Sequence, residues 1–171
     1  MRALVVDDEP IAREVLRDEL ELFPEVTVVG EAKDGPDALI QIANLHPELI
    51  FLDLQMPIMS GFEVVRSLKG PDMPVVIIVT AFDQHAIEAF DAGAVDYLLK
   101  PVSTARLRTA VERARFLLGK PAEVAANLSK LAAIPQSEEP VTRRIVGRSG
   151  DDYFLLDLDE ILAFQADREI G

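Results

Sequence analysis

Short apolar runs rich in β-branched residues recur along the first hundred residues, and each of them predicts a buried strand. The five predicted strands are Ala3–Val6, Val26–Gly30, Leu49–Leu52, Val75–Thr80 and Val95–Leu98. Between these runs, and after the last one, apolar residues recur at spacings of three and four, which predicts helices. The predicted helices are Ile11–Phe23, Asp37–Leu45, Phe62–Lys69, His85–Asp91 and Thr104–Leu118.

The regular alternation of strands and helices indicates the fold class. Strands that are apolar throughout are buried on both faces, so the sheet should be parallel and covered by helices on each side. We therefore expect an α/β protein with a flavodoxin-like (βα)₅ doubly wound sheet. Two helix starts carry local signals. Pro10 suits a first helical turn, and Ser60 with Glu63 fits a capping box.

The pattern changes after residue 119. Gly119-Lys120-Pro121 should break or kink the chain, because proline disfavours a helical residue before it. Helical spacing returns over Ala122–Ile134, with an apolar stripe at Val124, Leu128 and Leu131. We assign residues 120–140 to a helical linker and expect the stripe to help hold two chains together.

Residues 141–171 read as a short C-terminal β fragment. Arg144–Arg148 and Tyr153–Leu156 predict two strands of a hairpin, and Ile161–Gln165 predicts a third strand.

Composition and charge exclude several classes of protein. The chain has no cysteine, which rules out disulfides, thiolate metal sites and thiol catalysis. Its apolar runs are too short to cross a bilayer, so we expect a cytoplasmic protein with no membrane partner. The net charge is −13, and residues 1–100 hold 7 Lys and Arg against 19 Asp and Glu. That acidity makes the first hundred residues a poor surface for nucleic acid.

Polar side chains stand where four of the five predicted strands end. They are Asp7 and Asp8 after the first strand, Asp53 after the third, Thr80 at the end of the fourth, and Lys100 after the fifth, and the backbone amide of Ala81 follows Thr80. Ligands of open parallel sheets bind outside the carboxyl ends of the strands, so these groups should converge. Three carboxylates that lie close together repel one another and favour a bound cation. Mg²⁺ fits because it prefers oxygen ligands and keeps part of its water.

These residue types suit phosphoryl transfer. A carboxylate can attack phosphorus and form an aspartyl phosphate. The negative charge on the equatorial oxygens of the transferred phosphoryl group would then be balanced by Mg²⁺, by the Lys100 ammonium, and by hydrogen bonds from the Thr80 hydroxyl and the Ala81 amide. No base dedicated to hydrolysing the product is evident in the sequence. We therefore expect a phosphorylated switch that catalyses only its own phosphoryl transfer, rather than an enzyme with turnover.

Residues 1–119 resemble the receiver domains of two-component response regulators. The motifs that carry the resemblance are Val5-Val6-Asp7-Asp8-Glu9, Leu52-Asp53-Leu54-Gln55-Met56-Pro57-Ile58-Met59-Ser60-Gly61, Val79-Thr80-Ala81 and Asp96-Tyr97-Leu98-Leu99-Lys100-Pro101. The resemblance implies that a sensor histidine kinase phosphorylates Asp53. It also implies that Asp8, Asp53 and the backbone carbonyl of Gln55 hold Mg²⁺ with help from Asp7, and that the Lys100–Pro101 peptide is cis.

The resemblance extends to the switch. Tyr97 matches the aromatic residue that turns inward when the Thr80-type hydroxyl engages the phosphoryl group. In this family the face formed by the fourth helix, fifth strand and fifth helix commonly makes a symmetric dimer, so we expect a homodimer on phosphorylation. Acids at Asp91 and Asp96 and bases at Arg106, Arg113 and Arg115 are expected to pair across it.

The segment from residue 80 to 97 is similar to receivers that precede LytTR-type DNA-binding domains. Short stretches at residues 144–146, 156–161 and 163–166 resemble the opening strands of such a domain. We therefore assign residues 141–171 to the N-terminal fragment of a LytTR-type domain and expect DNA to be a partner of the full-length parent only.

Two functions stay open at this stage. One is transcriptional control through the output domain, and the other is a stand-alone phospho-switch that acts through protein contacts without binding DNA. A phosphatase of the haloacid dehalogenase type is disfavoured, because that class needs an acid two positions after its nucleophile and Gln55 stands there.

Overall fold

The computed structural model describes residues 1–70, 72–81, 95–133, 144–149 and 152–157. The chain divides into two compact units, residues 1–135 and residues 136–171, and each is described by itself. The predicted helix His85–Asp91 and the predicted strand Ile161–Gln165 lie outside the described residues. No helix in the described part of the chain is both long enough and apolar enough to cross a membrane.

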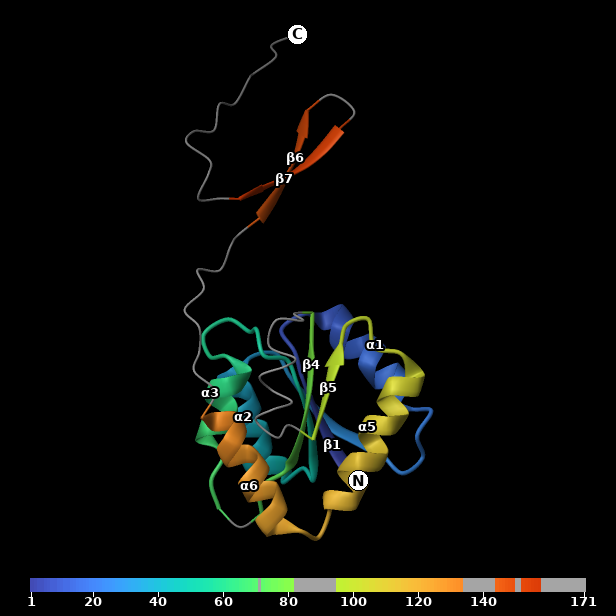
Figure 1. Cartoon of the computed structure of the whole chain (residues 1–171), viewed down its shortest axis with the longest axis vertical. Coiled ribbons are helices and arrows are strands. Elements are labelled where there is room, and N and C mark those ends of the chain that lie inside the picture. The colour runs from blue at the N-terminus through green and yellow to red at the C-terminus, as the bar shows by residue number, and fades with distance from the viewer. Residues whose placement is uncertain (71, 82–94, 134–143, 150–151, 158–171) are drawn as a thin grey trace. The chain divides into compact units, whose positions relative to one another are not determined.

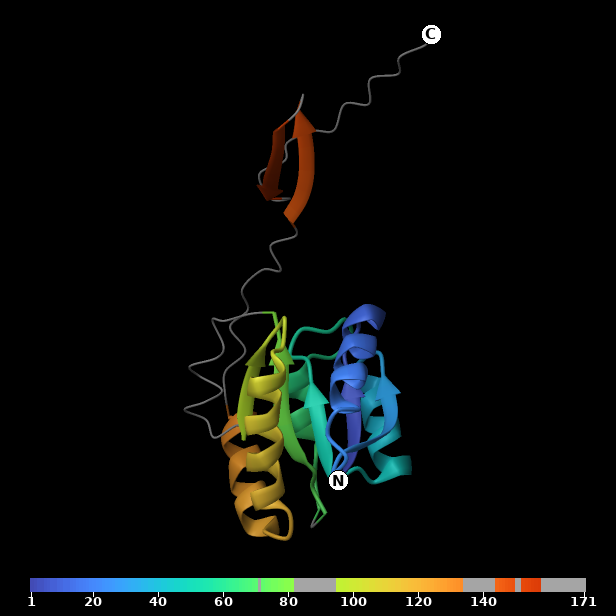
Figure 2. The ribbon, with the colours of Figure 1, turned by 90° about the vertical axis from the view of Figure 1, so that its right-hand side faces the viewer.

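The first unit is built on a five-stranded parallel sheet with the order β2-β1-β3-β4-β5. The strands are β1 Arg2–Val6, β2 Thr27–Ala32, β3 Leu49–Leu52, β4 Val75–Thr80 and β5 Asp96–Leu99. The helices are α1 Pro10–Leu20, α2 Gly35–Leu45, α3 Gly61–Ser67, α5 Thr104–Leu117 and α6 Pro121–Ala132. α1 and α5 cover one face of the sheet, and α2, α3 and α6 cover the other (Figures 1 and 2). The flavodoxin-like fold is confirmed.

The register of the central strands brings their carboxyl ends to one edge. Val6 lies opposite Leu52, Leu52 opposite Ile78, and Thr80 opposite Leu99. All residues of β3 and β4 are buried, as expected for strands covered on both faces. Whatever follows each of these strands is therefore held at the same end of a rigid sheet.

Local helix signals behave as predicted. Pro10 is the first residue of α1, and the capping box at the start of α3 is formed. The Ser60 amide donates to Glu63 Oε2 at 2.8 Å, and the Glu63 amide donates to Ser60 Oγ at 3.3 Å. Side-chain acceptors of this kind satisfy amides that a helix start leaves unpaired.

α6 belongs to the first compact unit and packs against α3. Its apolar stripe of Val124, Leu128 and Leu131 is buried, and Arg66 Nε on α3 donates to the Ala132 carbonyl at 2.9 Å. The expectation that this stripe holds two chains together is wrong, because these side chains already pack within their own unit. The assignment of residues 120–140 as a linker stays a prediction.

The described part of the second unit is an antiparallel hairpin. β6 Arg144–Ser149 pairs with β7 Asp152–Asp157, and Ser149 lies opposite Asp152 next to the turn. The predicted hairpin is confirmed. Its assignment to the opening of a LytTR-type domain stays a prediction.

Candidate functional site

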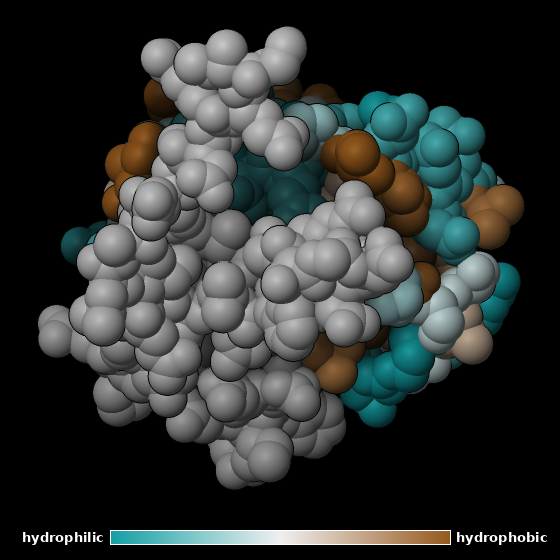
Figure 3. Space-filling model, turned by 90° about the horizontal axis from the view of Figure 1, so that it is seen from above, coloured by the Kyte–Doolittle hydropathy of each residue, from teal (hydrophilic) through white to brown (hydrophobic). Residues whose placement is uncertain are grey.

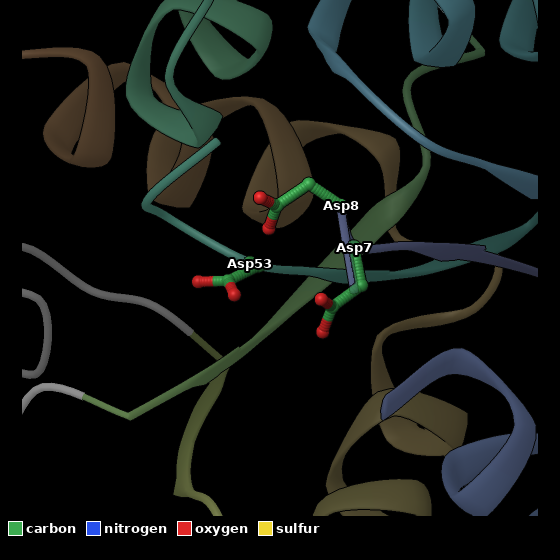
Figure 4. Close-up of side chains that lie close together, drawn as sticks. All are labelled: Asp7, Asp8 and Asp53. Atoms are coloured by element: carbon green, nitrogen blue, oxygen red, sulfur yellow. The ribbon is translucent and has the colours of Figure 1, made fainter. Parts of the chain in front are cut away.

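Three carboxylates meet at the carboxyl ends of β1 and β3. Asp7, Asp8 and Asp53 each place a carboxylate oxygen within 4.8 Å of the others (Figure 4). They come together because β1 and β3 are neighbours, and the Asp53 amide donates to the Val6 carbonyl at 2.9 Å. Asp7 and Asp53 are buried, whereas Asp8 is exposed. The three acids therefore converge as predicted, and the cluster is open to solvent at Asp8.

Lys100 supplies the cation of the site. Its Nζ lies 2.7 Å from Asp53 Oδ2 and 2.5 Å from Asp7 Oδ2, so one ammonium bridges two acids. The Lys100 amide donates to the Thr80 carbonyl at 2.9 Å, which continues the pairing of β5 with β4 as far as the site. The Lys100–Pro101 peptide is cis, as the resemblance implied.

Burial and charge act against each other in this group. Burial raises the pKa of Asp7 above its ordinary value, and the hydrogen bonds from Lys100 and the Glu9 amide only partly offset that effect. Burial by itself would lower the pKa of Lys100, but its hydrogen bonds and charge interactions with Asp53 and Asp7 leave that pKa above the ordinary value. Lys100 therefore stays protonated, while Asp7 is a carboxylate that its surroundings do not fully stabilise.

The loop after β3 shapes the surroundings of Asp53. The Gln55 amide donates to Asp53 Oδ1 at 3.1 Å, and the Gly61 amide donates to the Leu54 carbonyl at 3.0 Å. A Cβ atom on Gly61 would lie 2.3 Å from the Asp53 carbonyl oxygen, so only glycine fits there. Sequence reasoning did not assign Gly61 to the site, although it stood in one of the recognised motifs.

The remaining predicted site residues flank this cluster. Thr80 ends β4, is completely buried, and its hydroxyl has no hydrogen-bond partner among the described residues. Ala81 follows it and is exposed, while Tyr97 on β5 is buried. A buried hydroxyl without a partner is costly in a folded protein, which marks Thr80 as a group that can accept or donate a bond to a ligand.

Asp96 does not lie where the dimer prediction needed it. It is completely buried, and it pairs with Arg106 Nη2 at 3.0 Å and Arg113 Nη1 at 2.9 Å of the same chain. The expectation that Asp96 pairs with bases of a second chain is therefore wrong: its two oxygens are occupied by α5. Asp91, the other acid of that prediction, lies outside the described residues.

An apolar cleft of about 190 Å³ adjoins Lys100 and Pro101, between α1 and the start of the loop to α5. Ile11 and Val15 line it and are 74% and 56% exposed. Figure 3 looks onto the carboxyl ends of the strands and shows polar surface there, with apolar patches beside it.

Comparison with known proteins places the chain in one family. Residues 3–112 match the response regulator receiver domain, so the chain belongs to that family. The receiver of AraT from Geobacillus stearothermophilus is 33% identical with a TM-score of 0.60, covering 70% of this chain and 96% of that one. The response regulator domain of CheB from Thermotoga maritima is 34% identical with a TM-score of 0.53, covering 79% and 98%.

Relatives of known sequence extend the likeness. The chain is 47% identical over 113 residues to an uncharacterised response regulatory protein of Vibrio vulnificus, covering 66% of this chain and 47% of that protein. It is 34% identical over 172 residues to the transcriptional regulatory protein BtsR of Salmonella typhi, covering 100% and 67%. The chain spans about half the length of several curated relatives that it matches. It therefore carries the receiver domain of a two-component response regulator and is related to transcriptional regulators.

Proposed function

We propose that Asp53 accepts a phosphoryl group from a sensor histidine kinase in a Mg²⁺-dependent reaction. The observation that carries this proposal is the group of three carboxylates within 4.8 Å, with an ammonium 2.7 Å from Asp53. These groups lie at the carboxyl ends of neighbouring strands, which is where open parallel sheets bind their ligands.

The donor set fits a hard divalent cation. Asp7, Asp8, Asp53 and the Gln55 carbonyl would hold Mg²⁺, which supplies positive charge next to the transferred group. An Asp53 oxygen would attack phosphorus as the bond from phosphorus to the kinase histidine nitrogen breaks, and that nitrogen keeps the electron pair. Lys100 balances the charge on the phosphoryl oxygens. Asp53 and Lys100 are thus the catalytic residues of the transfer.

The state of Thr80 supports a switch. Its buried hydroxyl lacks a partner among the described residues, and forming one would recover about 1–3 kcal/mol of desolvation penalty. A phosphoryl oxygen on Asp53, bound also by the Ala81 amide, would provide that partner. Tyr97 on the neighbouring strand would then couple the site to the face formed by β5 and α5, which we propose dimerises on phosphorylation.

The apolar cleft supports the choice of a protein phosphodonor. Ile11 and Val15 on α1 line this cleft, and more than half of each of these large apolar residues is exposed to solvent. Clustered exposed apolar groups commonly mark protein contacts. A segment of the kinase that carries the phosphorylated histidine and docks on α1 would be close to Lys100.

The output of the switch is transcriptional control through a LytTR-type DNA-binding domain. In support, the likeness to a transcriptional regulatory protein of Salmonella typhi covers the whole of this chain, including residues 141–171. DNA would then be a partner of the longer protein.

The phosphorylation site can be tested with a small phosphodonor such as acetyl phosphate and intact mass spectrometry. We expect the mass of one phosphoryl group to be added with Mg²⁺ and not with EDTA. Asp53→Ala should abolish it, and Asp18→Ala, which changes an exposed carboxylate, should not. Phosphorylation that persists in Asp53→Ala, or in EDTA, would disprove the assignment.

A further inference from the structure

Arg13 on α1 contacts the backbone of the acidic pair, Asp7 and Asp8. Its Nη1 donates to the Asp7 carbonyl at 2.7 Å, and its Nε donates to Glu31 Oε2 at 3.1 Å. The Arg13 side chain is only 16% exposed. A guanidinium is a planar fork, so two acceptors bound at once define its orientation.

Glu31 makes a firm anchor for this fork. It lies on β2 opposite Val5 of β1, and the next residue, Ala32, accepts a hydrogen bond from the Asp7 amide at 3.1 Å. The other carboxylate oxygen of Glu31, Oε1, pairs with Arg17 Nη1 at 3.0 Å. Both carboxylate oxygens of Glu31 are therefore occupied by cations from α1.

The acceptor on Asp7 determines what Arg13 can do. The Asp7 carbonyl belongs to the planar peptide between Asp7 and Asp8, so fixing it fixes the direction in which the chain leaves β1. Asp8 is exposed and has little packing of its own to hold it. The described contacts of Arg13 are with this carbonyl and with Glu31, and not with the acidic side chains of the site.

We infer that Arg13 is a positioning residue that orients the Asp7–Asp8 peptide, so that both carboxylates face the same metal. This inference rests on the proposed Mg²⁺-dependent function. Outer residues that orient metal ligands commonly affect affinity about ten-fold or more. Arg13 would act in this way although it binds no metal itself.

The chain offers a matched control. Arg13→Gln and Arg17→Gln each remove one ion pair with Glu31 from the same helix, but only Arg13 also bonds Asp7. In the full chain, calorimetric titration with Mg²⁺ should show roughly ten-fold weaker binding for Arg13→Gln and an unchanged affinity for Arg17→Gln. Equal affinities in the two variants would overturn the inference, because the shared ion pair would then explain any effect.

A second measurement needs no metal. The Glu9 amide donates to Asp7 Oδ1 at 3.0 Å, so its hydrogen exchange reports the conformation of the acidic pair. We expect faster exchange in Arg13→Gln than in Arg17→Gln at equal thermal midpoints, and equal exchange would refute the positioning role. If the wild-type chain bound no Mg²⁺, the proposed function would be wrong, but the hydrogen exchange of the Glu9 amide would still test whether Arg13 positions the acidic pair. If Arg13→Gln did not fold, Glu31→Gln, which removes the anchor, should show the same weakening, and an unchanged affinity would refute it.

Discussion

Replacing Leu131 by alanine should destabilise the first unit by about 3 kcal/mol. Leu131 is 1% exposed and is among the largest fully buried side chains of the described residues. It projects from α6, which lies against α3 on one face of the sheet. The substitution therefore asks whether α6 is an integral part of the receiver or only a loosely attached linker.

The magnitude follows from burial. Truncating a buried leucine to alanine costs about 2.7–5.0 kcal/mol, of which the lost transfer from water is a large part and the cavity is the rest. We expect a value near the lower end, because α6 covers the outside of the unit and can move inward to close part of the cavity. A loss of about 3 kcal/mol raises the unfolded fraction more than a hundredfold in a domain whose whole stability is about 5–15 kcal/mol.

Urea unfolding of the full chain, followed by far-ultraviolet circular dichroism, measures this difference. Ser129→Ala on the same helix is the control, since Ser129 is exposed and its change should stay within about 0.5 kcal/mol. The reasoning would be refuted if Leu131→Ala cost no more than the control. It would also be refuted if α6 melted in a separate earlier transition, because the two elements would then not share one core.

Three further predictions concern the site and its supports. Burial raises the pKa of Asp7, so the folded chain binds the proton of the Asp7 carboxyl group more tightly than the unfolded chain does. The stability that this protonated group contributes is therefore lost as pH rises from the ordinary value of 3.8 through the pKa in the folded chain. Asp7→Asn should accordingly raise the thermal midpoint of the metal-free chain at neutral pH while weakening Mg²⁺ binding in calorimetry, and a lower midpoint would contradict the sign. Gly61→Ala should cost about 1–3 kcal/mol in urea unfolding and slow phosphorylation by acetyl phosphate, because its Cβ meets a rigid backbone carbonyl. Gly30→Ala, which meets only a side-chain methyl at under 3 Å, should cost less, and equal losses would argue against this reason. Asp96→Ala should lower the midpoint of urea unfolding by leaving two arginines of α5 without their buried partner, whereas Arg115→Ala at an exposed position should not.

Much of the architecture is determined by the sequence alone. β3 and β4 were predicted residue for residue, because a strand buried on both faces is a continuous apolar run with polar residues at its ends. Once the sheet is known to be parallel, the carboxyl ends of neighbouring strands meet at one edge. The approach of Asp7, Asp53 and Lys100 therefore followed from their positions after those runs.

Tertiary structure decided which partner each side chain takes. The spacing of Leu131 and its neighbours shows that one face of α6 is buried, but the same stripe could have met a second chain instead of α3. Asp96 reads as an available acid until α5 brings two arginines against it. The hydrogen bond from Arg13 to the Asp7 carbonyl could not be predicted from the sequence, because every residue has a backbone carbonyl and the acceptor is therefore not marked by any residue type. Such contacts depend on how helices settle on the sheet, which local periodicity does not encode.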